Sequence, residues 1–177
     1  MSSVPAADAD AGDDAPRLLP LRGTPATPLV ELLAPLVAAA RQDRGGRRLR
    51  VTCAVDESLT IDGDADLLGR AVAALLRRAV DAALTSDPES DLPPLGEVVV
   101  TAVRTPLAIE IEVADSGPAM PQAGGMNRVK SVRDGLVAEA EMLVARCGGT
   151  LNVGGCPEGG TAVTLRLPYR LARGMAA

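Results

Sequence analysis

The expected strands of this chain come in neighbouring pairs, and a helix separates each pair from the next. Hydrophobic periodicity predicts, in order, a helix, two strands, a long helix, two strands, an irregular segment, a helix and two strands. Strands that alternate singly with helices would favour a doubly wound parallel sheet, such as the Rossmann fold. We therefore predict an α+β fold, a two-layer sandwich whose mixed, largely antiparallel sheet is covered on one face by about three helices.

The long helix is the most clearly marked element. From Asp64 to about Leu84, apolar residues recur in steps of one and three, which keeps one face towards a core for about five turns. An earlier helix is expected to open at Thr27, its N-cap, and Pro28, and Pro35 should kink it or shift its start. A third helix is expected over 134–147, with Asp134 as its N-cap.

Alternating apolar and polar residues mark the strands. Strands are expected over 49–55 and 59–61, and a hairpin over 98–114, in which Leu107, Ile109, Ile111 and Val113 face one way. A last hairpin is expected from 151–153 and 162–167, ended by Pro168. The intervening segment 115–133 is rich in Gly, Pro and Met, which is typical of a functional lid or a disordered insertion.

The two ends of the chain are expected to lie outside the folded domain. Residues 1–16 contain four aspartates and no basic residue, so they supply most of the formal net charge of −5. They are expected to form a disordered acidic tail, followed by a domain over 17–170 and a C-terminal tail over 171–177. Residues 17–21 are expected to form a short edge strand at the start of the domain.

Composition excludes several kinds of function. The chain has no His, so it carries no phosphohistidine and no His metal ligand or catalytic base. Its single aromatic residue is Tyr169, and the charge outside the tail is nearly balanced, so we expect no nucleic acid partner. We find no signal peptide and no bilayer-spanning apolar run, so we expect no membrane insertion, a cytoplasmic location and reduced cysteines.

Three motifs occur in a fixed order along the chain. They are Asp62–Leu68 before the long helix, Ile111–Gly117 at the end of a strand, and Leu143–Pro168, which contains Cys147-Gly148-Gly149 and Gly159-Gly160-Thr161. Their order and spacing resemble the ATP-binding domain of bacterial sensor histidine kinases, the GHKL or Bergerat-fold group that also includes DNA gyrase, Hsp90 and MutL. The resemblance covers about 27–168 and implies an ATP site between the helical layer and a flexible lid.

The nucleotide site that this resemblance implies has lost several of its usual residues. Ala74 and Arg78 stand where the family carries asparagines, one of which coordinates Mg²⁺, and a guanidinium has no lone pair for a metal. Arg78 could instead meet a phosphate directly, or fill the metal position and pair with Asp81 or another carboxylate. Cys147 replaces the customary His of the closing motif.

The other two sequence motifs that the family carries around its nucleotide site are kept only in part. The adenine-binding aspartate and its first glycine are matched by Asp115 and Gly117, whereas Ala119 replaces the second glycine. The glycines that expose amides to the triphosphate are reduced to Gly135, and Asp134 beside it adds a negative charge. The resemblance thus implies a nucleotide site of Asp115, Gly117, Arg78, Asp81, Gly135 and Thr161, with lid residues Arg128, Lys130 and Arg133, and with no catalytic residue or metal ligand.

The matches and the losses together favour a stand-alone, degenerate histidine-kinase-like ATPase domain. It would act in bacterial signal transduction by binding a signalling protein, with ATP binding weak or lost and Mg²⁺ not bound. Two alternatives stay open. One is an active ATP-binding protein that resembles anti-sigma-factor kinases or phosphorylates a partner in trans. The other is a scaffold or dimerisation module, which would form a homodimer.

Overall fold

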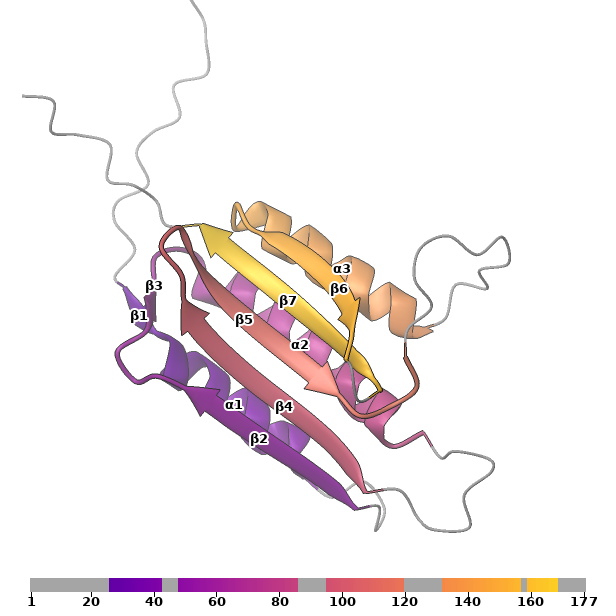
Figure 1. Cartoon of the computed structure of the whole chain (residues 1–177). Coiled ribbons are helices and arrows are strands. Elements are labelled where there is room, and N and C mark those ends of the chain that lie inside the picture. The colour runs from indigo at the N-terminus through magenta and orange to yellow at the C-terminus, as the bar shows by residue number, and fades with distance from the viewer. Residues whose placement is uncertain (1–25, 43–47, 86–94, 120–131, 157–158, 169–177) are drawn as a thin grey trace, which may run out of the picture.

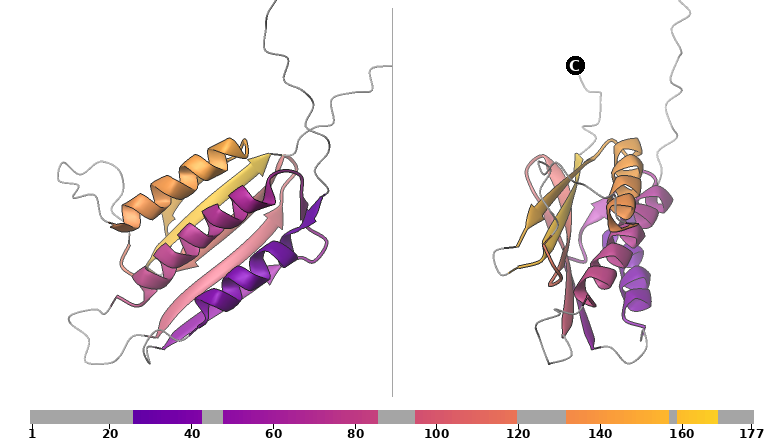
Figure 2. Two further views of the ribbon diagram at one scale, coloured as in Figure 1. Left: turned by 180° about the vertical axis from the view of Figure 1, so that it is seen from behind. Right: turned by 90° about the vertical axis from the view of Figure 1, so that its right-hand side faces the viewer.

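The chain folds into two layers, a sheet and a layer of helices on one of its faces (Figures 1 and 2). The computed structural model describes residues 26–42, 48–85, 95–119, 132–156 and 159–168. Its elements are β1 (Thr27–Pro28), α1 (Leu29–Ala40), β2 (Leu49–Val55), β3 (Thr60–Ile61), α2 (Ala65–Ala83), β4 (Gly96–Arg104), β5 (Ala108–Asp115), α3 (Val132–Arg146), β6 (Thr150–Gly155) and β7 (Thr161–Pro168).

Within the described ranges, the main sheet has five strands in the order β2-β4-β5-β7-β6. The β2–β4 pair is parallel, and the other three neighbouring pairs are antiparallel. A separate two-stranded ladder joins β1 to β3. The predicted fold class, a mixed and largely antiparallel sheet covered on one face by three helices, is confirmed.

Helix α2 is the centre of the helical layer and lies between α1 and α3 (Figure 2). Its N-cap is Asp64, whose carboxylate accepts a hydrogen bond from the backbone N–H of Leu67 at 3.0 Å. Between α2 and the sheet, aliphatic and alanine side chains from α2, β4, β5 and β7 pack together in the core. The periodicity therefore predicted α2 correctly, because one apolar stripe meets one buried sheet face.

The start of the first helix differs from its prediction. Thr27 and Pro28 form strand β1, in which Thr27 is paired with Ile61 of β3, so Thr27 is not an N-cap. Helix α1 begins at Leu29, whose N–H donates to the carbonyl of Leu59 at 2.8 Å. Pro35 lies inside the helix, with its ring on the exposed side. The ladder with β3 fixes an extended backbone here, and local sequence gives no sign of that pairing.

Two further expectations need correction. Leu107 does not share the buried face of β5, since it lies before the strand and is 69% exposed. The preceding turn is closed between Thr105 and Ala108, with the N–H of Thr105 donating to the Ala108 carbonyl at 2.8 Å. Helix α3 begins at Val132, so Asp134 lies in its first turn and is not its N-cap. The expected strand over 17–21 and most of the segment 115–133 lie outside the described residues.

Candidate functional site

The candidate site lies where the central strands of the sheet end next to the last turns of α2. Asp115 is the last residue of β5, and the sheet register places it between Val98 of β4 and Thr161 of β7. Asp115 and Thr161 are both buried. A carboxylate at the end of a central strand, facing a helix, needs a polar partner because burial removes its hydration.

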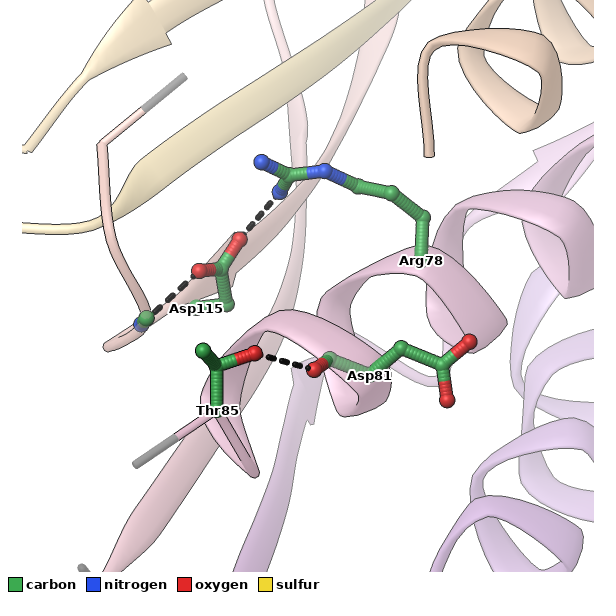
Figure 3. Close-up of polar contacts among 5 residues, drawn as sticks. Arg78, Asp81, Thr85 and Asp115 are labelled. Atoms are coloured by element: carbon green, nitrogen blue, oxygen red, sulfur yellow. Dashed lines mark hydrogen bonds and ion pairs between the residues drawn. The ribbon is translucent and has the colours of Figure 1, made fainter. Parts of the chain in front are cut away.

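That partner is Arg78 of α2, whose Nη1 donates to Oδ2 of Asp115 (Figure 3). The two side chains form a buried ion pair, since Arg78 is 2% exposed and Asp115 is 4% exposed. The other carboxylate oxygen, Oδ1, accepts from the N–H of Gly117 at 2.9 Å. Both oxygens of Asp115 are therefore engaged by residues of this chain.

The electrostatics of the pair are set by burial and by the opposite charge. Burial is the larger influence and raises the pKa of Asp115, because a carboxylate loses its hydration there. The charge of Arg78 and backbone hydrogen bonds from Gly117 and Thr161 act against this rise and lower the pKa. The guanidinium is not fully satisfied, since Nε of Arg78 has no hydrogen-bond partner among the described residues.

Glycines bring the backbones around Asp115 unusually close together. A Cβ on Gly117 would lie 2.4 Å from the carbonyl of Ala82 in α2, so this residue lets the strand end touch the helix. A Cβ on Gly160 would lie 1.8 Å from the carbonyl oxygen of Asp115, and Gly160 has a φ of +93°. The motif Gly159-Gly160-Thr161 thus packs directly on the backbone of Asp115.

Two of the predicted site residues, Asp81 and Gly135, do not contact the ion pair. The carboxylate of Asp81 points away from Asp115 in Figure 3, and the Asp81 carbonyl accepts from the hydroxyl of Thr85 at 2.9 Å. Gly135 lies exposed in α3 with open space around it. Arg128 and Lys130, and the side chain of Arg133, lie outside the described residues.

No metal site accompanies the pair in the described part of the chain. No group of three or more His, Cys, Asp or Glu residues that could hold a metal ion occurs there. Ala74 and Arg78, which the resemblance matches to the family's asparagines, are both buried. Cys53, Cys147 and Cys156, which all lie in the described ranges, are not joined in disulfides. Separately, no helix in the described ranges is long and apolar enough to cross a membrane.

A pocket of about 40 Å³ lies at the other end of the sandwich. It is formed by β3, the first turn of α2, the start of β5 and the end of β7, with Cys147 in its wall. Binding pockets for small molecules usually measure about 300–1,000 Å³, so this one is too small for a nucleotide. It is separate from Arg78 and Asp115.

Sequence reasoning named both members of the ion pair but did not join them. Arg78 lies between Leu75 and Ala79 on the apolar stripe of α2, and a charged residue in such a stripe signals a buried partner. The packing role of Gly160 was missed, because a Gly-Gly pair between two strands is also typical of an ordinary turn.

Comparison with known proteins shows which family the sequence matches. Residues 63–171 match the family described as histidine kinase-, DNA gyrase B-, and HSP90-like ATPase. A search of curated proteins finds no match.

Several solved structures share the fold. The catalytic domain of histidine kinase ThkA, in a nucleotide-free form, has a TM-score of 0.66 at 15% identity, covering 84% of this chain and 98% of that one. The mycobacterial sensor histidine kinase MprB has 0.61 at 24%, covering 81% and 95%. The Acinetobacter baumannii histidine kinase AdeS has 0.64 at 11%, covering 86% and 70%. From the family match, which spans more than half of its residues, this chain belongs to the histidine kinase-, DNA gyrase B- and HSP90-like ATPases.

Proposed function

We propose that this protein is a degenerate member of its family, which acts in signal transduction by binding a protein partner and has little or no affinity for Mg·ATP. The observation that carries the proposal is the buried ion pair between Arg78 and Asp115. It bears on both the metal and the adenine positions of the family's site.

At the metal position, the charge has the wrong sign. Proteins of this family bind ATP together with Mg²⁺. Mg²⁺ requires oxygen ligands, and a guanidinium offers donors only and remains cationic. Arg78 and Ala74 therefore do not fit a bound Mg²⁺, and no step that needs the metal is assigned to this chain.

At the adenine position, the acceptor is already in use. Oδ2 of Asp115 accepts from Arg78, and Oδ1 accepts from Gly117. A nucleotide that needs Asp115 must first separate a buried ion pair, and breaking such a pair costs about 3 kcal/mol or more. Since 1.4 kcal/mol corresponds to a tenfold change in affinity, this cost alone weakens binding by about a hundredfold.

The signalling role is proposed from the relatives. The structures that share the fold are named histidine kinases: ThkA contributes a catalytic domain, and MprB is a sensor histidine kinase. A chain without His cannot phosphorylate itself on histidine. A fold retained without that chemistry supports a role in which the surface of the domain binds a signalling protein.

The nucleotide part of the proposal is tested by calorimetry and thermal unfolding with Mg·ATP. We expect no heat of binding, and no shift of the melting temperature at about 1 mM Mg·ATP. A ligand with a dissociation constant near 10 μM would at that concentration stabilise the fold by about 2.7 kcal/mol, a shift of several degrees. Micromolar, Mg²⁺-dependent binding that disappears in Asp115→Asn would contradict the proposal.

Partner binding is tested with the full chain as bait. Capture of the same signalling protein at equal yield, with Mg·ATP and with EDTA, is the expected result. Capture that requires Mg·ATP would count against a nucleotide-independent role.

A second candidate function is supported by Nε of Arg78, for which the described ranges supply no hydrogen-bond partner. If Arg78 leaves Asp115 and meets a phosphate, it can replace the metal as the counter-charge of ATP. This candidate predicts ATP binding without Mg²⁺, weakened at least about tenfold by Arg78→Ala. The matched control is Arg77→Ala, because Arg77 is the exposed neighbour on the same helix. Absence of binding to metal-free ATP excludes it.

A further inference from the structure

Strand β2 lies at one edge of the five-stranded sheet, with α1 over it in the helical layer (Figure 2). Among the described residues, only β4 pairs with it. The carbonyl of Arg48 accepts from the N–H of Gly96, so the even-numbered residues of β2 direct their backbone groups towards β4. The backbone groups of the odd-numbered residues, from Leu49 to Val55, therefore point out of the sheet, towards the place where a further strand would bind.

This edge lacks the usual protection against pairing with another chain. Strand β2 contains no proline and no bulge, since every residue from Leu49 to Val55 is paired with β4 in one register. Its single charged residue is Arg50, whose Nη1 lies 4.0 Å from Oε1 of Glu97. Nε of Arg41, the C-cap of α1, donates to the outward carbonyl of Val51 at 3.0 Å. A carbonyl has two lone pairs, so Val51 can still accept from a further strand.

The two ends of this edge carry opposite charges. At its start, residues 41–50 contain five arginines and one aspartate, and Arg48 is exposed. At its far end, Asp56 and Glu57 directly follow β2 and are exposed. Glu31 lies at that end too, because the first turn of α1 is hydrogen-bonded to the segment between β2 and β3. An edge with a positive and a negative end is complementary to a second copy of itself in the antiparallel direction.

Helix α1 adds an uncharged surface at the same edge. Its 12 residues include one charged side chain, Glu31. A helix that faces solvent usually carries charged residues on its outer face. Here the exposed residues after Glu31 are Ala34, Pro35, Ala38 and Ala39. The helix over β2 is therefore suited to pack beside another helix.

We propose that a second copy of this chain binds at this edge, with β2 pairing antiparallel to the partner's β2. The described strands of the two copies then form one continuous sheet, and the two α1 helices lie side by side in opposite directions. With the two-fold axis at Thr52, Val51 pairs with the partner's Cys53, and Arg48 lies opposite the partner's Asp56. Odd-numbered residues meet odd-numbered ones, so the outward N–H and C=O groups of the two strands bond to each other.

The charges and the backbone thus favour the same register. Symmetry makes each contact occur twice, which doubles the effect of the two end-to-end attractions. The interface lies on β2 and α1, whereas the Arg78–Asp115 pair lies between α2 and β5. The proposal is therefore independent of whether the chain binds a nucleotide.

A disulfide at the two-fold axis tests the pairing and its register. Opposite Cα atoms at a non-hydrogen-bonded position such as Thr52 lie about 4.5 Å apart, within the reach of a disulfide. The background is the full-length chain with Cys53, Cys147 and Cys156 changed to serine. We expect Thr52→Cys to give at least about ten times more disulfide-linked dimer than Ala54→Cys on mild oxidation. Ala54 is the matched control, exposed on the same face of β2, but its two copies would lie about 13 Å apart along the sheet.

Charge reversal tests the two ends of the edge. Arg48→Glu places like charges opposite each other twice, and should raise the dissociation constant of the dimer at least about tenfold in sedimentation equilibrium. Adding Asp56→Arg to Arg48→Glu should restore most of the affinity, because the attraction is then reversed in sign on both sides. Arg70→Glu, at an exposed position of α2, is the control and should leave the dissociation constant unchanged.

Four results would overturn the proposal. The parent chain could sediment as a monomer at concentrations up to about 100 μM, where even weak interfaces associate. It could dimerise only after deletion of residues 1–16, which would assign the edge to that acidic segment. Equal disulfide yields from Thr52→Cys and Ala54→Cys would indicate random collision. A dimer that Arg48→Glu leaves intact would assign the contact to another surface, such as the opposite edge at β6.

Discussion

Replacing Asp115 by alanine should lower the free energy of unfolding by about 3–5 kcal/mol, because it leaves the charge of Arg78 buried without a partner. Domains are stable by only about 5–15 kcal/mol, so this loss is a large part of the total. Urea unfolding followed by circular dichroism is the suitable measurement. The chain has no Trp and one Tyr, which makes fluorescence a poor probe.

Two controls separate the ion pair from simple loss of side-chain volume. Arg78→Met/Asp115→Leu removes both charges and should cost much less than Asp115→Ala, since apolar replacement of a whole buried pair is often close to neutral. Glu110→Ala disrupts the partly exposed pair with Arg166, at 3.5 Å, and should cost no more than about 1 kcal/mol. A loss below about 1 kcal/mol for Asp115→Ala would mean that Arg78 and Asp115 are not a buried pair in solution.

Gly160→Ala should destabilise the fold by about 4 kcal/mol, through backbone strain together with a steric clash. The new Cβ would lie 1.8 Å from the carbonyl oxygen of Asp115, and the residue has a φ of +93°. The same unfolding experiment measures the loss. Because the clash is with backbone, the end of β5 must shift, so the Arg78–Asp115 contact should be disturbed as well.

The neighbouring glycine supplies a matched control. Gly159 has a φ of +95°, but a Cβ there would meet nothing within 4 Å. Gly159→Ala should therefore show only the cost of the left-handed backbone, about 1–2 kcal/mol. Equal losses in the two variants would show that close packing on Asp115 contributes nothing.

The parts of the fold that sequence predicted are those set by one buried face. The stripe of α2 and the alternation in β4, β5 and β7 show directly in the order of apolar residues. The predicted start of α1 was wrong because Thr27 and Pro28 are held extended by pairing with β3, which lies far along the chain. The prediction that Leu107 shares the buried face of β5 was wrong, because alternation does not show where a turn ends and a strand begins.

The site was predicted as a set of residues and not as a geometry. Helical spacing makes Asp81 a near neighbour of Arg78, yet the structure pairs Arg78 with Asp115. That choice depends on how β5 is aligned with β4 and β7 beneath α2, which no local pattern contains. Burial also removes the competition from water that would let an exposed arginine change partners.

The parallel pairing of β2 with β4 also bears on the order in which the domain closes. Val51 is paired with Val98, and all of α2 lies between them in the chain, whereas β4 with β5 and β6 with β7 are joined by short connections. Contacts between residues close in sequence form first, since they cost less loop entropy. The β2–β4 and β5–β7 pairings each enclose a whole helix of the chain, so both should form after the two hairpins. Strand β2 lies at an edge of the sheet, and its amides should be among the first to exchange with deuterium when the native monomer opens.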